Sequence, residues 1–330
     1  MAIPSSGKIS FSDVNTELQR SQTAPLSMGE TDFRLLTQKP VGSTVILPTD
    51  LYNKSYIFYA TITSNQKELN LATWAQANGW NGVFPAVITI NPGVYIWSDS
   101  TSIAGLTTGN FPRGLTIINN GYIMGKGGRG GLGNSGPSSV GLPGGPAISL
   151  GSNAIINMAG TISYIGGGGG GGGGAGWGGG GGGAGGGQGG SSYYSGTQIG
   201  GAGGVIGLSG ANGGEKWSEY NQYGRGGSAG GGGGTGKDLQ GTDNCTAGGG
   251  GGRIFPGTTT SSPGGDGGGP NTVGTAGSGR GGGGGGGWGA AGGESTATSN
   301  AGGAGGKAVA LNSHTCSITG ATSRVYGAVS

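Results

Sequence analysis

The sequence predicts a mostly β and irregular protein in three parts. These are a small N-terminal docking module, a small β domain of repeated strand–Gly–strand units, and a bundle of packed polyglycine type II helices joined by loops. Three observations lead to this prediction. Glycine supplies 92 of the 330 residues and is gathered into long runs. Short apolar patterns that end in glycine recur along the chain, and the first 58 residues have an ordinary composition.

The overall composition excludes several classes of protein. Gly and Pro together make up about a third of the chain without a G-X-Y period, which usually indicates low complexity. Six Trp and eleven Tyr with only 9% charged residues are, however, unlike a solvated tail. A net charge of +3 without a Lys/Arg run gives no electrostatic footprint for nucleic acid. No apolar run reaches 18 residues and no secretory signal is visible, so we expect no membrane insertion and folding where the chain is made.

Residues 1–58 divide into short helical pieces. Ser12 is a predicted N-cap for a helix within residues 10–18, and further helical turns are expected near residues 28–36 and 48–53. Four prolines interrupt this part of the chain, so it cannot bury a large core by itself. We therefore expect a docking module whose missing apolar surface is supplied by a partner.

The next part of the chain reads as strands with one helix. Residues 56–63 alternate between apolar and polar side chains, as in a strand. Residues 69–78 have helical spacing and stop before Gly79, which suits the end of a helix. Residues 86–90 and 94–97 follow as two strands around a turn.

An internal repeat links this region to the glycine runs. Residues 115–125 and 154–166 share an apolar pair, Asn, a short gap, Gly, and then an Ile that leads into glycine. Residues 315–327 are a weaker third copy. Units repeated in this way suit a small stacked β structure in which rungs or hairpins share one core.

The glycine runs need an explanation because a single run is a flexible coil. If many extended threefold helices pack side by side, their N–H and C=O groups point outward in three directions and can pair between helices. A surrounded helix then tolerates only Gly, whereas one at the edge can carry side chains on its exposed face. We assign Gly170, Gly180 and Gly284 to this scaffold and expect Trp177 and Trp288 to cover it. The alternative is a set of flexible linkers; collagen is excluded because the runs lack its spacing.

These zones give the predicted domains. They are residues 1–58 as a virion-docking module, 59–124 as a β-rich connecting domain, 125–306 as the bundle with the strand repeat 154–165 inserted, and 307–330 as strands that return to the β domain.

The segments quoted so far resemble a known family. Residues 117–128 lead into glycine, residues 71–80 precede them, and residues 3–17 open the chain. Together with glycine runs that alternate with short variable segments, they resemble the distal long-tail-fibre adhesins of T-even-like bacteriophages. The resemblance implies a virion protein at the tail, assembled in the host cytoplasm. It also implies binding to an outer-membrane protein or lipopolysaccharide of a Gram-negative host. The front end differs from that family, and it looks like a module that docks on another tail component.

The resemblance further implies that loops at one end of the bundle carry the binding. The segments between the glycine runs are residues 191–199, 215–223, 237–246, 253–262, 270–276 and 294–301. Large, rigid aromatic side chains dominate binding hot spots. The candidate receptor-binding residues are therefore the aromatics Tyr193, Tyr194, Trp217, Tyr220, Tyr223 and Phe255.

Nothing in the sequence points to catalysis or to a cofactor. His314 is the only histidine, so a His-based triad or a multi-histidine metal site is not available. Cys245 and Cys316 have no metal-binding spacing, and they are either two free thiols or one disulfide. We expect no enzyme. Two alternatives to an adhesin stay open: a virion decoration or tail-tip structural protein, and an ice-binding protein.

Overall fold

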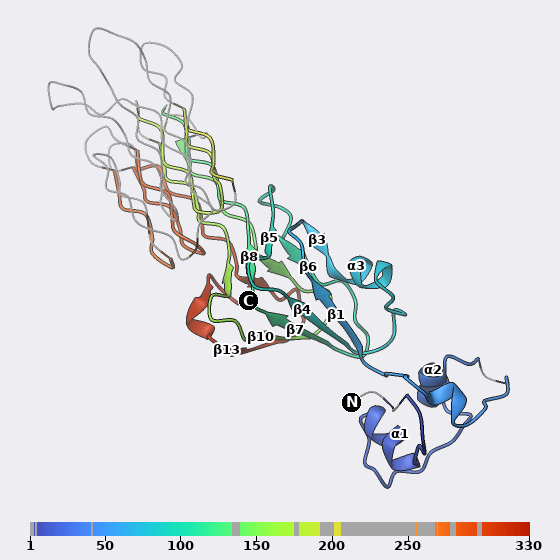
Figure 1. Cartoon of the computed structure of the whole chain (residues 1–330). Helices are drawn as coiled ribbons and strands as arrows, with labels where there is room; N and C mark the ends of the chain where they lie inside the picture. The colour runs from blue at the N-terminus through green and yellow to red at the C-terminus, as the bar shows by residue number, and fades with distance from the viewer. Residues whose placement is uncertain are drawn as a thin grey trace, which may run out of the picture.

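The computed structural model describes residues 3, 5–40, 42–133, 139–174, 178–191, 201–205, 255, 268, 270–277, 282–295 and 299–330. These residues form few helices and mostly short strands and irregular backbone, so the predicted mostly β and irregular class is confirmed. Figure 1 shows the first 56 residues and the glycine-rich part at opposite ends of a central body of strands. None of the helices in the described part of the chain is long and apolar enough to cross a membrane.

The N-terminal segment, residues 3–56, contains α1 (Phe11–Glu17), α2 (Thr31–Thr37) and a 3-10 turn η1 (Thr49–Leu51). The N-cap of α1 is Ser10, so the prediction of Ser12 was wrong. The Ser10 hydroxyl accepts from the Asp13 N–H at 3.1 Å, and the Asp13 carboxylate accepts from the Ser10 N–H at 2.7 Å. This reciprocal pair satisfies two N–H groups at the start of the helix, which fixes the start two residues earlier than expected.

The body consists of five stacked coils whose strands form three parallel sheets. The chain visits the sheets in turn, so that each of the first four coils adds one strand to each sheet and the fifth adds one strand to each of the first two sheets. The first sheet contains β1 (Phe58–Ile62), β4 (Ala86–Ile90), β7 (Leu115–Asn119), β10 (Ala154–Met158) and β13 (Cys316–Gly320). The second contains β2 (Gln66–Lys67), β5 (Tyr95–Trp97), β8 (Tyr122–Met124), β11 (Tyr164–Gly166) and β14 (Val325–Tyr326). The third contains β3 (Leu69–Asn70), β6 (Leu106–Thr107), β9 (Ile148–Ser149) and β12 (Val309–Ala310).

Alternating side chains explain why these strands face one core. Along β4 and β7 every second residue is buried, and the buried positions pair in register across the first sheet. Ile88 pairs with Ile117, and Ile117 pairs with Ile156. Because side chains of a strand alternate between its two faces, this register stacks the isoleucines inside the coils. The helix α3 (Leu71–Ala77) follows β3, where the sequence predicted it, although its first two expected residues belong to the strand.

The register differs from the repeat seen in the sequence. The shared apolar-pair-and-Asn pattern sets Asn119 beside Asn157, but the structure pairs Asn119 with Met158. A shift by one residue would turn every side chain of the strand to the other face, so burial of Ile117 and Ile156 decides the register. Tyr164 of β11 pairs with Tyr122 of β8. The connection from β10 to β11 is therefore longer than the connection from β7 to β8.

Two glycine-rich excursions leave the body at the same corner of successive coils. The first, residues 125–147, lies between β8 and β9, and the second, residues 167–308, lies between β11 and β12. Their described residues lie side by side in Figure 1, and we call them the glycine bundle. The domain boundaries given above stay predictions.

Candidate functional site: the glycine bundle and its anchor

The bundle is organised around residues 166–174. The N–H groups of three successive residues point to three different neighbouring segments, and every third N–H returns to the same segment. The bonds run from Gly168, Gly171 and Gly174 to the carbonyls of Gly145, Leu142 and Ser139, from Gly169 and Gly172 to Ala184 and Gly181, and from Gly170 and Gly173 to Ala290 and Gly293.

The carbonyl groups of the same segment follow the same three-residue period. Pairs of them accept from Gly306 and Gly303, from Gly128 and Gly131, and from Gly286 and Gly283. All of these donor–acceptor distances lie between 2.6 and 2.9 Å. Residues 168–174 are thus surrounded by six neighbouring segments, and this buried backbone is paired without a side chain.

The three predicted scaffold glycines lie inside this arrangement. A Cβ atom at Gly170 would stand 1.8 Å from the carbonyl oxygen of Gly303, and one at Gly180 would stand 2.0 Å from that of Gly172. Gly284 is buried; its N–H donates to the Thr275 carbonyl at 3.0 Å and its carbonyl accepts from Gly293 at 2.7 Å. No other residue type fits at Gly170 or Gly180 unless the backbone moves.

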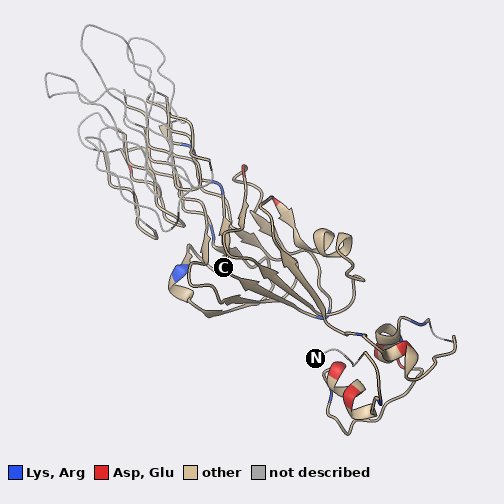
Figure 2. Ribbon diagram, in the orientation of Figure 1, with Lys and Arg blue, Asp and Glu red and all other residues tan. Residues whose placement is uncertain are grey.

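Side chains appear in the bundle where a segment has an open face. In the first excursion Lys126, Arg129 and Leu132 occupy every third place and are half-exposed, while the glycines between them are buried. Before β12, the exposed residues Ala301, Ala304 and Lys307 follow the same period. A segment with a residue other than glycine at every third position therefore has one of its three faces open to solvent. Figure 2 shows that the described part of the bundle is nearly uncharged.

An aromatic stack anchors the bundle to the second sheet. Trp288 is fully buried and its ring stacks on Phe255, with ring centroids 4.3 Å apart. Phe255 in turn lies 5.3 Å from the Tyr164 ring, which is parallel to Tyr122 at 6.0 Å. Burial of the ring raises the pKa of the Tyr122 phenol, with smaller contributions from the neighbouring tyrosines. This apolar contact is the place where the bundle meets the body.

The stack contains one of the predicted site residues. Phe255 was expected on an exposed loop, but the structure places it against the base of the bundle, in contact with Tyr164 and Trp288. Phe255 is therefore a member of the anchor, and its receptor contact stays a prediction. The other candidates lie outside the described residues: Tyr193, Tyr194, Trp217, Tyr220 and Tyr223. Trp177 and Cys245 also lie outside them.

Sequence reasoning missed the tyrosines of the second sheet, although a signal was present. A Tyr-Ile pair occurs at residues 95–96, 122–123 and 164–165. In each pair the Ile is fully buried and the Tyr is half-exposed, and the three tyrosines stand in register. Tyr95 and Tyr122 are 4.5 Å apart and stacked.

The described residues offer little chemistry beyond binding. Within them no group of three or more His, Cys, Asp or Glu side chains could hold a metal ion. Cys316 is half-buried, and burial raises the pKa of its thiol.

Large apolar side chains are exposed on the N-terminal segment, where Phe11 is 60% and Ile46 59% accessible, and Met28 and Leu47 are also exposed. That segment thus carries an uncovered apolar surface.

A family model described as "Phage tail fibre adhesin Gp38" matches residues 57–230. Among solved structures, the chain is similar to the "gp37-gp38 adhesin tip complex of the bacteriophage S16 long tail fiber". The similarity has 20% sequence identity and a TM-score of 0.48, and it covers 90% of this chain and 91% of that chain. No curated protein matches.

Proposed function

The chain belongs to the Gp38 family of phage tail fibre adhesins, and we propose that it attaches the virion to an outer-membrane receptor of a Gram-negative host. The family places the protein in the virion tail and gives it a role in attachment. The proposal adds the receptor class, an outer-membrane protein or lipopolysaccharide, and a position at the distal tip. It also adds assembly in the host cytoplasm.

The bundle acts in this proposal as a rigid scaffold of polyglycine II helices. The observation that carries it is the three-residue period with which residues 168–174 bond to six neighbours. An extended threefold helix has this period and makes no bonds within itself. The interior N–H and C=O groups already form hydrogen bonds with neighbouring segments. These glycines therefore have no polar group available to bind a ligand.

Recognition therefore belongs to the segments that the glycine runs connect. We propose Tyr193, Tyr194, Trp217, Tyr220 and Tyr223 as receptor contacts, since Tyr and Trp give large contact area at low entropic cost. Phe255 is left out because it packs in the anchor. The cluster of Trp217, Tyr220 and Tyr223 is the strongest candidate because three aromatics lie within seven residues.

The N-terminal segment is the proposed attachment to another phage tail component. Its exposed Phe11, Met28, Ile46 and Leu47 would be covered by a partner. A hollow of about 390 Å³ beside α2, lined in part by Leu35 and Pro40, adds further apolar surface to the same segment. Residues 1–58 would thereby fix the adhesin on the tail.

The receptor proposal is tested by exchanging residues 215–223 for a Gly/Ser sequence of equal length and measuring adsorption of the phage to host cells. We expect intact particles that no longer adsorb. The control Ala304→Ser changes an exposed residue of the bundle outside these segments and should leave adsorption unchanged. Normal adsorption after the first exchange would contradict the proposal and favour a structural protein that does not touch the receptor.

A further inference from the structure

The N-terminal segment meets the body at one small junction centred on Tyr56. The Tyr56 side chain is 4% exposed, and its ring lies 5.2 Å from that of Phe84 in the body. Its backbone N–H donates to the Glu17 carboxylate of α1 at 2.8 Å. Tyr56 thus belongs to both parts, and the chain passes from one to the other at this residue.

An ion network crosses the same junction. Arg113 lies in the turn before β7, and its Nη1 atom is 2.6 Å from Asp32 Oδ1 and donates to the Tyr56 hydroxyl. On the other side of Asp32, Arg20 lies 3.4 Å from Oδ2 and also binds Glu30 at 2.8 Å. Of these four charged residues only Arg113 comes from the body. Arg113 therefore supplies the body's side of this ion network.

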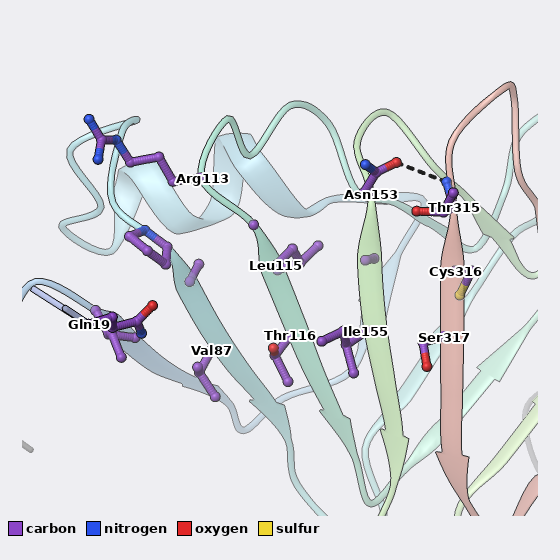
Figure 3. Close-up of a pocket in the computed structure, with 15 residues that line it drawn as sticks. Gln19, Val87, Arg113, Leu115, Thr116, Asn153, Ile155, Thr315, Cys316 and Ser317 are labelled. Carbon is purple, nitrogen blue, oxygen red and sulfur yellow. Dashed lines mark hydrogen bonds between the residues drawn. The ribbon is translucent and has the colours of Figure 1, made fainter. Parts of the chain in front are cut away.

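Hollows flank this contact on several sides. A groove of about 490 Å³ separates Gln19 from the outer face of the first sheet, where Figure 3 shows Val87, Thr116 and Ile155 beside it. A second hollow, of about 350 Å³, lies between Gln38 and the loop before β4. Between these hollows the two parts share one apolar cluster, in which Tyr56 packs on Phe84, and the ion network is a charged contact that joins them.

We propose that Arg113, Asp32 and Tyr56 form a releasable latch that fixes the direction in which the adhesin body projects from the N-terminal segment. When the ion pair separates, the segment pivots about residues 55–57 while each part keeps its own fold. The side chains of Arg113 and Asp32 are 33% and 25% exposed, so solvent and salt weaken their attraction. A segment fixed on the tail would then allow the body, with its bundle, to tilt toward the host surface.

The test measures the distance between spin labels on the two parts. Labels are placed at Thr16→Cys in α1 and Thr61→Cys in β1 of the full chain, in a background with Cys245→Ser and Cys316→Ser. We expect Arg113→Gln and Asp32→Asn each to broaden the distance distribution, and the double variant to broaden it no further, because both remove one contact. Raising NaCl to 1 M, where the screening length is about 3 Å, should broaden the unmodified chain in the same direction.

Two controls keep the test decisive. Lys67→Gln removes one positive charge and the ion pair with Asp99 in the body, at 3.6 Å, and should leave the distribution unchanged. A second label pair at Thr16 and Thr49 within the segment should stay narrow in every variant. The latch is refuted if Arg113→Gln keeps the original distribution, or if Lys67→Gln changes it equally. Broadening of the pair within the segment would mean unfolding, and it would also refute the pivot.

Discussion

Two adjacent residues of the bundle, Gly303 and Ala304, differ in the space that is available for a side chain. A Cβ at Gly303 would stand 2.0 Å from the Leu142 carbonyl oxygen, whereas the side chain of Ala304 points to solvent. At this scale a carbonyl oxygen of a neighbouring segment selects glycine. The conformational freedom of glycine is not the reason, because neither Gly303 nor Gly170 has a positive φ.

This difference gives a prediction for single substitutions. Gly170→Ala places a methyl group against the Gly303 carbonyl, and overpacking of this kind costs about 1–3 kcal/mol. The free energy of unfolding, measured with urea, should fall by that amount. The control Ala304→Ser lies on an exposed face and should change it by less than about 0.5 kcal/mol. Equal stability of both variants would show that residue 170 is not enclosed.

At the scale of the element, the period of three decides which deletions a glycine segment tolerates. Deleting Gly170 alone rotates every later N–H and C=O of the segment by one third of a turn, toward the wrong neighbour. Deleting residues 169–171 keeps the directions and shortens the segment by one turn of about 9 Å. We expect the single deletion to lower the melting temperature more than the triple deletion does. The reverse order would contradict the threefold geometry.

The elements also show how far the sequence could be read. α1, α3 and β4 were predicted because caps, helical spacing and alternation are local signals. The pairing of Ile117 with Ile156 could not be read from the repeat, because similarity between two copies does not show which side chains are buried together. The division of the strands among three parallel sheets is set by contacts between coils, which no single strand encodes.

At the scale of the whole molecule, body and bundle are held together by different forces. The body has a continuous apolar core, which runs on into the N-terminal segment, because one cluster contains Phe33 and Leu36 as well as Ile62 and Val309. Among the described residues, the buried members of the apolar cluster at the bundle are Met124, Ala184 and Trp288. The interior of the bundle thus depends on backbone hydrogen bonds, each with a net stabilisation of about 1 kcal/mol. The glycine composition predicted such a scaffold. It did not predict that Phe255 packs between Trp288 and Tyr164, because no local sequence signal shows which segment contacts the body.

Amide hydrogen exchange of residues 166–174, measured by mass spectrometry on the full chain, is the most direct test of a bundle held by its backbone. The N–H groups of residues 168–174 donate to the carbonyls of three surrounding segments, so they should exchange as slowly as those of β7 in the body core. The exposed N-terminal residues 5–8 serve as the unprotected reference. Slow exchange is the predicted result. Exchange of residues 166–174 at the rate of that reference would show flexible linkers and contradict the scaffold.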